Sequence, residues 1–204
     1  MNKTQDCTKQ QGDDMPKLST ARESLARLDQ RIAREPDPVR RGWLQTYRNH
    51  WWGEVIGDVG MVMQTMSHGP IRYSFDGHPF MVPDGGMAAV ETYEDTQRMY
   101  EGVVALGVKM AGPVDEERIA FDEKGLIISC ILTAVYPGVY LTKHSEPVDP
   151  DGVYLVRWPN VTMIRFDEHG LMQGEDIVNG APILVRKVDR SQVDMLVDGP
   201  MLAN

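Results

Sequence analysis

The spacing of hydrophobic residues changes between the two halves of the chain. Up to about residue 106, apolar side chains recur at helical spacing. Leu25, Leu28 and Ile32 follow a capping-box sequence at Thr20 and predict a helix of about 15 residues that ends before Pro36. Beyond residue 113 the apolar and polar positions alternate, which is typical of strands.

The segment 38–58 predicts the second helix. Asp37 is a suitable N-cap, Pro38 fits the first helical position, and Gly57 can end the helix in a left-handed conformation. Beyond it we expect a short helix, a strand over 71–76, and a long helix over about 86–106 capped by Asp84. Two hairpins should follow, formed by 114–121 with 126–136 and by 153–166 with 171–178. The apolar run 183–188 predicts an extra strand or an interface segment.

This order of elements predicts an α+β fold, with the N-terminal helices packed in a strongly curved, mostly antiparallel sheet. The 204 residues suffice for one domain, which we place at 17–180. Residues 1–16 form a polar tail, and 181–204 form a C-terminal extension that we expect at an oligomer interface. Because 126–136 is apolar on both faces, we expect a homodimer or homotrimer that buries the outer face of the sheet.

Composition excludes several classes of partner. The net charge is −9 and there is no basic cluster, which argues against nucleic acid and anionic membrane surfaces. No apolar run approaches the roughly 18 residues of a membrane span, and the N-terminus lacks the apolar core of a signal peptide. Cys7 and Cys130 lie in contexts that do not favour a disulfide, so we expect a cytoplasmic protein.

The helix 38–58 has an unusual composition for a core helix. One broad stripe of it carries Trp43, Tyr47, His50, Trp51 and Glu54. Aromatic rings beside an imidazole and a carboxylate predict one wall of a ligand pocket, and an imidazole near a carboxylate can act as an acid or oxyanion donor. The alternatives are an ordinary amphipathic helix, and a buried histidine bonded to a core carbonyl.

The strand 71–76 presents polar side chains on one face. Arg72, Ser74 and Asp76 alternate with Tyr73 and Phe75, and Arg72 is either a functional or a surface residue. Nucleotide, metalloprotease and hydrolase motifs are absent. His144 and Glu146, with His169, have the form of an iron site, but His169 lies in a turn sequence, and we therefore expect no metal and no cofactor.

Two segments carry a family resemblance: HWWGEVIGDVGMVMQTMSHGPIRYSFDG early in the chain and VTMIRFDEHGLMQGEDIV late in it. They resemble the nuclear transport factor 2-like superfamily, the cone fold of ketosteroid isomerase, scytalone dehydratase and SnoaL-like polyketide cyclases. The resemblance covers about residues 20–180. It implies a cone-shaped cavity for a small molecule, although these motifs mark the fold more than the chemistry.

The resemblance also implies roles for individual positions. The oxyanion-stabilising tyrosine of the isomerases falls at His50, and their general-base aspartate falls near Ser74, with Asp76 two residues on. A serine cannot replace a carboxylate base, so ketosteroid isomerisation is not expected. On the last strand the implied cavity-facing residues include Glu175 and Asn179, and the same register turns Arg157 inward and Trp158 outward.

From these residues we expect a cofactor-independent lyase that acts on a hydrophobic aromatic small molecule, such as a lignin-derived phenolic dimer, by general acid–base catalysis. The expected catalytic residues are His50, Glu54, Arg72 and Glu175. The expected substrate-binding residues are Trp43, Tyr47, Trp51, Tyr73, Ser74, Asp76, Arg157 and Asn179. The alternatives are an isomerase or cyclase acting on a polycyclic substrate, and a non-catalytic binding or assembly module of the same fold.

Overall fold

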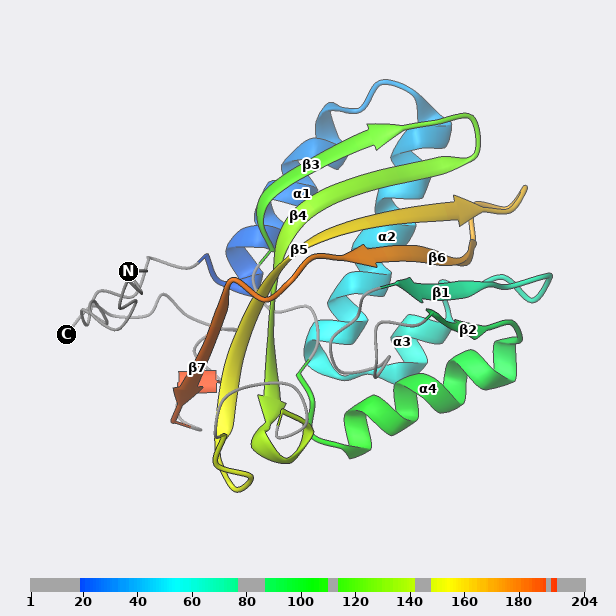
Figure 1. Cartoon of the computed structure of the whole chain (residues 1–204). Coiled ribbons are helices and arrows are strands. Elements are labelled where there is room, and N and C mark those ends of the chain that lie inside the picture. Colours follow the sequence, from blue (N-terminus) through cyan, green and yellow to red (C-terminus); the bar gives the residue numbers. More distant parts are fainter. Residues whose placement is uncertain (1–18, 77–86, 110–113, 142–147, 190–191, 194–204) are drawn as a thin grey trace, which may run out of the picture.

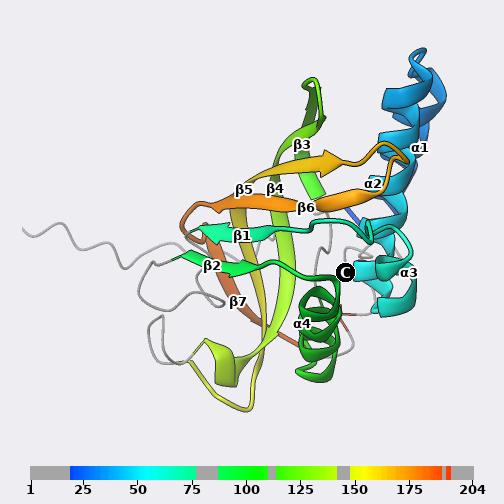
Figure 2. The same cartoon turned by 90° about the vertical axis from the view of Figure 1, so that its right-hand side faces the viewer.

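The computed structural model describes residues 19–76, 87–109, 114–141, 148–189 and 192–193. Seven strands form one sheet in the order β2-β1-β6-β5-β4-β3, and β7 pairs with the first half of β5. All neighbouring strands are antiparallel except β1 and β6, which run parallel. The sheet curves, and in Figure 2 the helices lie to one side of it. The predicted α+β cone fold is therefore confirmed.

The helices begin and end where the sequence places them, with one exception. Helix α1 (Ala21–Arg34) starts at the predicted Thr20 capping box, and α2 (Pro38–Ile56) runs from Asp37 to a left-handed Gly57. A short α3 (Val59–Met63) follows. The fourth helix, α4, is shorter than predicted: it spans Tyr93–Ala105 and is capped by Thr92, whereas Asp84 lies outside the described residues.

The shortening of α4 has a clear cause, because the residues before it form a strand that the helical spacing concealed. Strand β2 (Met87–Val90) pairs antiparallel with β1 (Tyr73–Asp76) at the edge of the sheet. The remaining strands follow the expected hairpins and the expected extra strand (Figure 1): β3 (Val114–Phe121), β4 (Gly125–Pro137), β5 (Val153–Phe166), β6 (Met172–Asn179) and β7 (Leu184–Val188).

A bulge in β6 determines which of its side chains enter the cone. Ile164 on β5 is opposite Glu175, but Phe166 is opposite Met172, so β6 carries one extra residue between these pairs. Gly174 lies in this bulge with a φ of 102°, and a Cβ atom there would stand 1.9 Å from the carbonyl oxygen of Arg72. Only glycine fits such a close approach. The bulge allows both Met172 and Glu175 to face the interior.

The outer face of the sheet exposes apolar side chains. Val161 on β5 lies opposite Val178 on β6, and these residues are 37% and 45% exposed. Met163, two residues further along β5 on the same face, is also exposed. The homodimer or homotrimer expected from the sequence remains a prediction, for which this face is the proposed contact.

We expect sedimentation at micromolar concentration to give a mass two or three times the monomer mass of 23.0 kDa. Val178→Lys should shift the protein toward the monomer, because a charge would be buried in the contact. Val39→Lys, on an exposed position of α2, should not. A wild-type protein that sediments only as a monomer would refute the proposed contact.

Candidate active site

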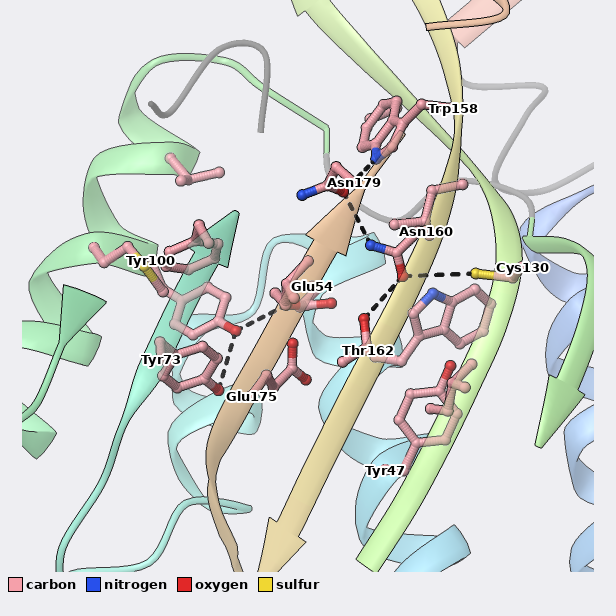
Figure 3. Close-up of a pocket in the computed structure, with 18 of the residues that line it drawn as sticks. Tyr47, Glu54, Tyr73, Tyr100, Cys130, Trp158, Asn160, Thr162, Glu175 and Asn179 are labelled. Carbon is pink, nitrogen blue, oxygen red and sulfur yellow. Dashed lines mark hydrogen bonds between the residues drawn. The ribbon is translucent and has the colours of Figure 1, made fainter. Parts of the chain in front are cut away.

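The described part of the chain contains a cavity enclosed between α2, α4 and the concave face of the sheet (Figure 3). It holds about 850 Å³ of space not filled by protein atoms, including the part that opens to solvent. Its walls are mainly aromatic and aliphatic. The lining residues with polar atoms are Tyr47, Trp51, Glu54, Tyr73, Tyr100, Cys130, Tyr136, Trp158, Asn160, Thr162, Glu175 and Asn179.

A chain of hydrogen bonds connects α2, α3 and α4 at one end of the cavity. The Tyr100 hydroxyl donates to Glu54 Oε1 at 2.9 Å and lies 3.0 Å from His50 Nε2. On the other side of the imidazole, Nδ1 lies 2.8 Å from the Thr65 hydroxyl, which itself donates to the Val62 carbonyl at 2.6 Å. Each of the two hydroxyl protons is therefore already donated elsewhere.

The hydrogen bonds of the Tyr100 and Thr65 hydroxyls bear on the charge of His50. When Tyr100 donates to Glu54 and Thr65 donates to the Val62 carbonyl, both ring nitrogens of His50 donate to these hydroxyl oxygens, an arrangement that favours the imidazolium form. Burial lowers the pKa of His50, but the hydrogen bonding and charge of Glu54, together with the charge of Glu175, outweigh burial and raise the pKa above its ordinary value. Glu54 Oε1 lies 3.6 Å from His50 Nε2.

Glu175 lies opposite this chain and has a different environment. Its Oε1 is 4.0 Å from His50 Nε2, and no described residue donates a hydrogen bond to it. Burial in the cavity wall raises the pKa of Glu175 to about 7; the positive charge of His50 opposes this shift and the negative charge of Glu54 adds to it. A carboxylate with a pKa near neutrality and no hydrogen-bond donor is suited to accept a proton.

The Tyr73 hydroxyl completes this end of the cavity. It lies 3.4 Å from the Tyr100 hydroxyl and 3.5 Å from His50 Nε2. Burial raises the pKa values of both phenols well above 10, with the nearby carboxylates adding to the shift. Both tyrosines are therefore neutral hydrogen-bond donors rather than bases.

Six of the twelve predicted site residues line this cavity. They are Tyr47, Trp51, Glu54, Tyr73, Glu175 and Asn179. His50 lies directly behind the wall: it is 1% exposed and reaches the cavity only through Tyr100 and Tyr73. The roles assigned to these residues remain predictions.

The polar face of β1 was assigned to the wrong side of the sheet. Tyr73 and Phe75 fill the cone, so the alternation of the strand turns Arg72, Ser74 and Asp76 away from the cavity. Arg72 and Asp76 are exposed, and Ser74 donates to Asp176 at 2.6 Å.

Two further predicted site residues, Trp43 and Arg157, do not line the cavity. Trp43 stacks on Phe166 with ring centroids 5.4 Å apart. Arg157 pairs with Asp115 at 2.7 Å, while its neighbour Trp158 lines the cavity, the reverse of the prediction. Directly opposed residues of antiparallel strands share a face, and Glu175 is opposite Ile164, so the even-numbered positions of β5 face inward.

The alternative metal site has little support from the described residues. His144 and Glu146 lie outside them, and His169 is an exposed turn residue. Within the described ranges no cluster of His, Cys, Asp and Glu could hold a metal ion. No described helix is long and apolar enough to cross a membrane.

Comparison with known proteins bears on the fold. No protein-family model and no curated protein matches the sequence. Among solved structures, the similar chains include a SnoaL-like polyketide cyclase candidate from Jannaschia sp. CCS1, with 17% identity, a TM-score of 0.48, and coverage of 82% of this chain and 99% of that one. Another is RV0760c from Mycobacterium tuberculosis in complex with estradiol-17β-hemisuccinate, with 15% identity, a TM-score of 0.48, and coverage of 69% and 95%.

A third similar chain is the epoxide hydrolase/cyclase-like enzyme SalBIII of pyran ring formation in salinomycin, with 12% identity, a TM-score of 0.46, and coverage of 68% and 91%. The described residues have the α+β cone architecture expected from the sequence. At such identities and TM-scores we take nothing about activity from these neighbours, and the chemistry must come from the cavity itself.

Proposed function

We propose that the protein is a cofactor-independent lyase that acts on a neutral, hydrophobic aromatic molecule held in the cone. The observation that carries this proposal is the position of Glu175, a carboxylate with a raised pKa and no described hydrogen-bond donor, opposite the donor chain of Tyr100 and His50. A proton acceptor and proton donors thus lie together at one end of an apolar cavity, with Glu175 Oε1 4.0 Å from His50 Nε2. This is the arrangement that an elimination needs.

The two groups have complementary tasks in a loss of water. Glu175 takes a proton from carbon, the electron pair of that C–H bond forms a double bond, and the C–O bond breaks. Tyr100 gives its proton to the departing hydroxyl, and His50 restores that proton through Nε2 at 3.0 Å. Water and an alkene are the products, and the proton on Glu175 returns to His50 through solvent.

The same residues can release formaldehyde from a hydroxymethyl group. Glu175 then takes the O–H proton, a C–C bond breaks, and the electron pair moves into the aromatic ring system, where Tyr100 protonates the atom on which charge collects. A phenolic dimer with a benzylic hydroxyl provides such an electron sink: loss of that hydroxyl and of the phenol proton as water gives a quinone methide, which then accepts the electron pair of the C–C bond and becomes a phenol again. Product analysis separates dehydration from formaldehyde release, and both from an isomerase or cyclase, which would leave the mass of the substrate unchanged.

The pH dependence of turnover tests the proposal. Glu175 acts as a base only when it is ionised, and its pKa is about 7. We therefore expect kcat/KM for a neutral phenolic dimer to rise about tenfold per pH unit below 7, and to fall again at the higher pH at which His50, whose pKa is raised, loses its proton. The assay should contain a chelator and no added nucleotide. A flat profile between pH 5 and 8, or activity that disappears with chelator, would refute the proposal.

A further inference from the structure

The far end of the cavity contains a second polar group of residues, which we call the amide cluster: Trp158, Asn160, Thr162 and Asn179 (Figure 3). Trp158 Nε1 donates to Asn179 Oδ1 at 2.7 Å, and Asn160 Nδ2 donates to the same oxygen at 3.0 Å. Asn160 Oδ1 accepts from the Thr162 hydroxyl at 2.8 Å. An indole nitrogen can only donate, so this chain of bonds fixes the orientation of both amides.

The side-chain amides of Asn160 and Asn179 keep N–H groups available for a ligand. Both lone pairs of Asn179 Oδ1 are occupied, and Asn160 Oδ1 accepts from Thr162 and, at 3.9 Å, from Cys130. Asn160 Nδ2 has one N–H left, and Asn179 Nδ2 makes only a long bond of 3.4 Å to the Asp76 carbonyl. The free hydrogen-bonding capacity of the two amides is therefore on their N–H groups.

Trp51 adds a third donor to the cavity wall. Its side chain is 4% exposed, and its buried Nε1 has no hydrogen-bond partner among the residues that the structure describes. A buried N–H without an acceptor costs free energy, and buried donors are normally paired. An oxygen atom of a bound molecule would satisfy it.

The charge of the cavity determines what kind of oxygen can bind there. None of the described lining residues is Lys, Arg or His, whereas Glu54 and Glu175 both contribute carboxylates. The nearby imidazolium of His50 lies behind the wall and is already paired with Glu54. A ligand carboxylate would be buried without a counter-ion, which is strongly unfavourable, so a neutral carbonyl, ether or phenol oxygen is favoured.

The distance between Glu175 and Asn179 indicates the length of a ligand that contacts both. Glu175 and Asn179 face the same cavity from one regular stretch of β6, four residues apart. At the rise of a strand their Cα atoms are separated by about 13 Å. A molecule that reaches both ends needs roughly the length of two linked aromatic rings, and the aromatic walls suit flat rings.

We infer that the amide N–H groups of Asn160 and Asn179 form a donor site for a neutral oxygen atom, that Trp51 supplies a further N–H in the wall of the same cavity, and that these donors select two-ring substrates whose reacting end lies at Glu175. The inference rests on the proposed function for the role of Glu175, but the donor site itself can be tested by binding alone. It makes these three residues determinants of specificity at a distance from the chemistry.

Three probes of one shape test the donor site: 4-acetylbiphenyl, 4-isopropylbiphenyl and biphenyl-4-carboxylate. The first has a neutral acceptor and no donor, the second has neither, and the third is an anion. Equilibrium dialysis against the full chain at pH 8 should show 4-acetylbiphenyl bound about three- to tenfold more tightly than 4-isopropylbiphenyl, the usual worth of one or two neutral hydrogen bonds. The carboxylate should bind more weakly than both.

Single substitutions test which protein donors bind the carbonyl oxygen of the acetyl probe. Trp51→Phe removes an N–H for which the described part of the chain offers no acceptor, so it should keep the fold and reduce the preference for the acetyl probe. Asn179→Leu should reduce it further, although this change also leaves Trp158 without its acceptor. Trp52→Phe is the matched control, because this neighbouring indole does not line the cavity and its loss should leave the preference unchanged.

The outcomes separate the inference from the proposed function. Equal binding of the acetyl and isopropyl probes, tighter binding of the carboxylate, or a preference lost in Tyr73→Phe but kept in Trp51→Phe and Asn179→Leu would overturn the donor site. Glu175→Gln should leave the acetyl preference intact. A preserved preference combined with unchanged turnover in Glu175→Gln would refute the proposed function and leave the donor site standing.

Discussion

Glu175→Gln is expected to lower turnover by about 10²–10⁴-fold, the usual worth of a positioned general base. Glutamine keeps the shape of the side chain and loses only the ability to accept a proton. Binding of a neutral ligand should therefore persist, and the loss should appear in kcat rather than in KM. Glu168→Gln is the matched control, because that carboxylate is exposed in the turn before β6. Turnover within tenfold of wild type in Glu175→Gln would contradict the assignment.

The same variant should be more stable than the wild type at alkaline pH. The pKa of Glu175 in the folded protein, about 7, lies above its ordinary value of 4.5, so the folded state binds the proton more tightly than the unfolded state. The stability associated with that proton is present below about pH 4.5 and is lost as pH rises through about 7. A shift of this size corresponds to about 3 kcal/mol.

Chemical denaturation at two pH values measures this effect. The free energy of unfolding of Glu175→Gln should exceed that of the wild type by up to about 3 kcal/mol at pH 8, and the difference should nearly vanish at pH 4. A difference that does not change with pH would show that Glu175 is solvated in the folded state. A base that destabilises the fold fits the usual conflict between stability and activity.

His50→Leu is expected to have the second large effect, this time on stability. Its loss leaves Glu54 without its counter-ion and removes one hydrogen bond from each of the Tyr100 and Thr65 hydroxyls. Breaking a buried ion pair in this way typically destabilises a protein by about 3–5 kcal/mol. Since His50 acts through Tyr100, the variant should also lower kcat with little change in KM.

A double-mutant cycle distinguishes the paired charge from simple packing. Combining His50→Leu with Glu54→Gln should recover part of the lost stability, because the second change removes the uncompensated carboxylate. His169→Ala should be silent, since its side chain is 74% exposed. Additive effects of the two changes would show that the charges of His50 and Glu54 are not coupled.

The sequence predicts local features of this fold well. The caps of α1 and α2 depend on neighbouring residues only, and the two hairpins follow from strand-like segments joined by short turn sequences. The prediction failed at β2, where pairing with β1 overrides a helical spacing that continues into α4. Such pairing depends on residues that are distant in the chain, so local spacing cannot reveal it.

The sequence predicted those cavity residues whose pattern is visible within a single helix. The stripe on α2 correctly placed Tyr47, Trp51 and Glu54 in the cavity wall. Tyr100 and Asn160 were missed, because their importance arises only from contacts with other elements, Glu54 in one case and Asn179 in the other. The alternating polar positions from Trp158 to Thr162 on β5 were an available sign, but the face of the strand was assigned in reverse.

The bulge at Gly174 has a consequence for the polarity of the cavity. A side chain at position 174 would collide with the Arg72 carbonyl, so the extra residue and the glycine must occur together. Without the extra residue, β6 could not turn both Met172 and Glu175 into the cone. In this chain one inserted residue therefore decides whether the carboxylate of Glu175 shares the cavity with Met172. The register of the strand, and not only the choice of residues along it, thus sets the polarity of the cavity.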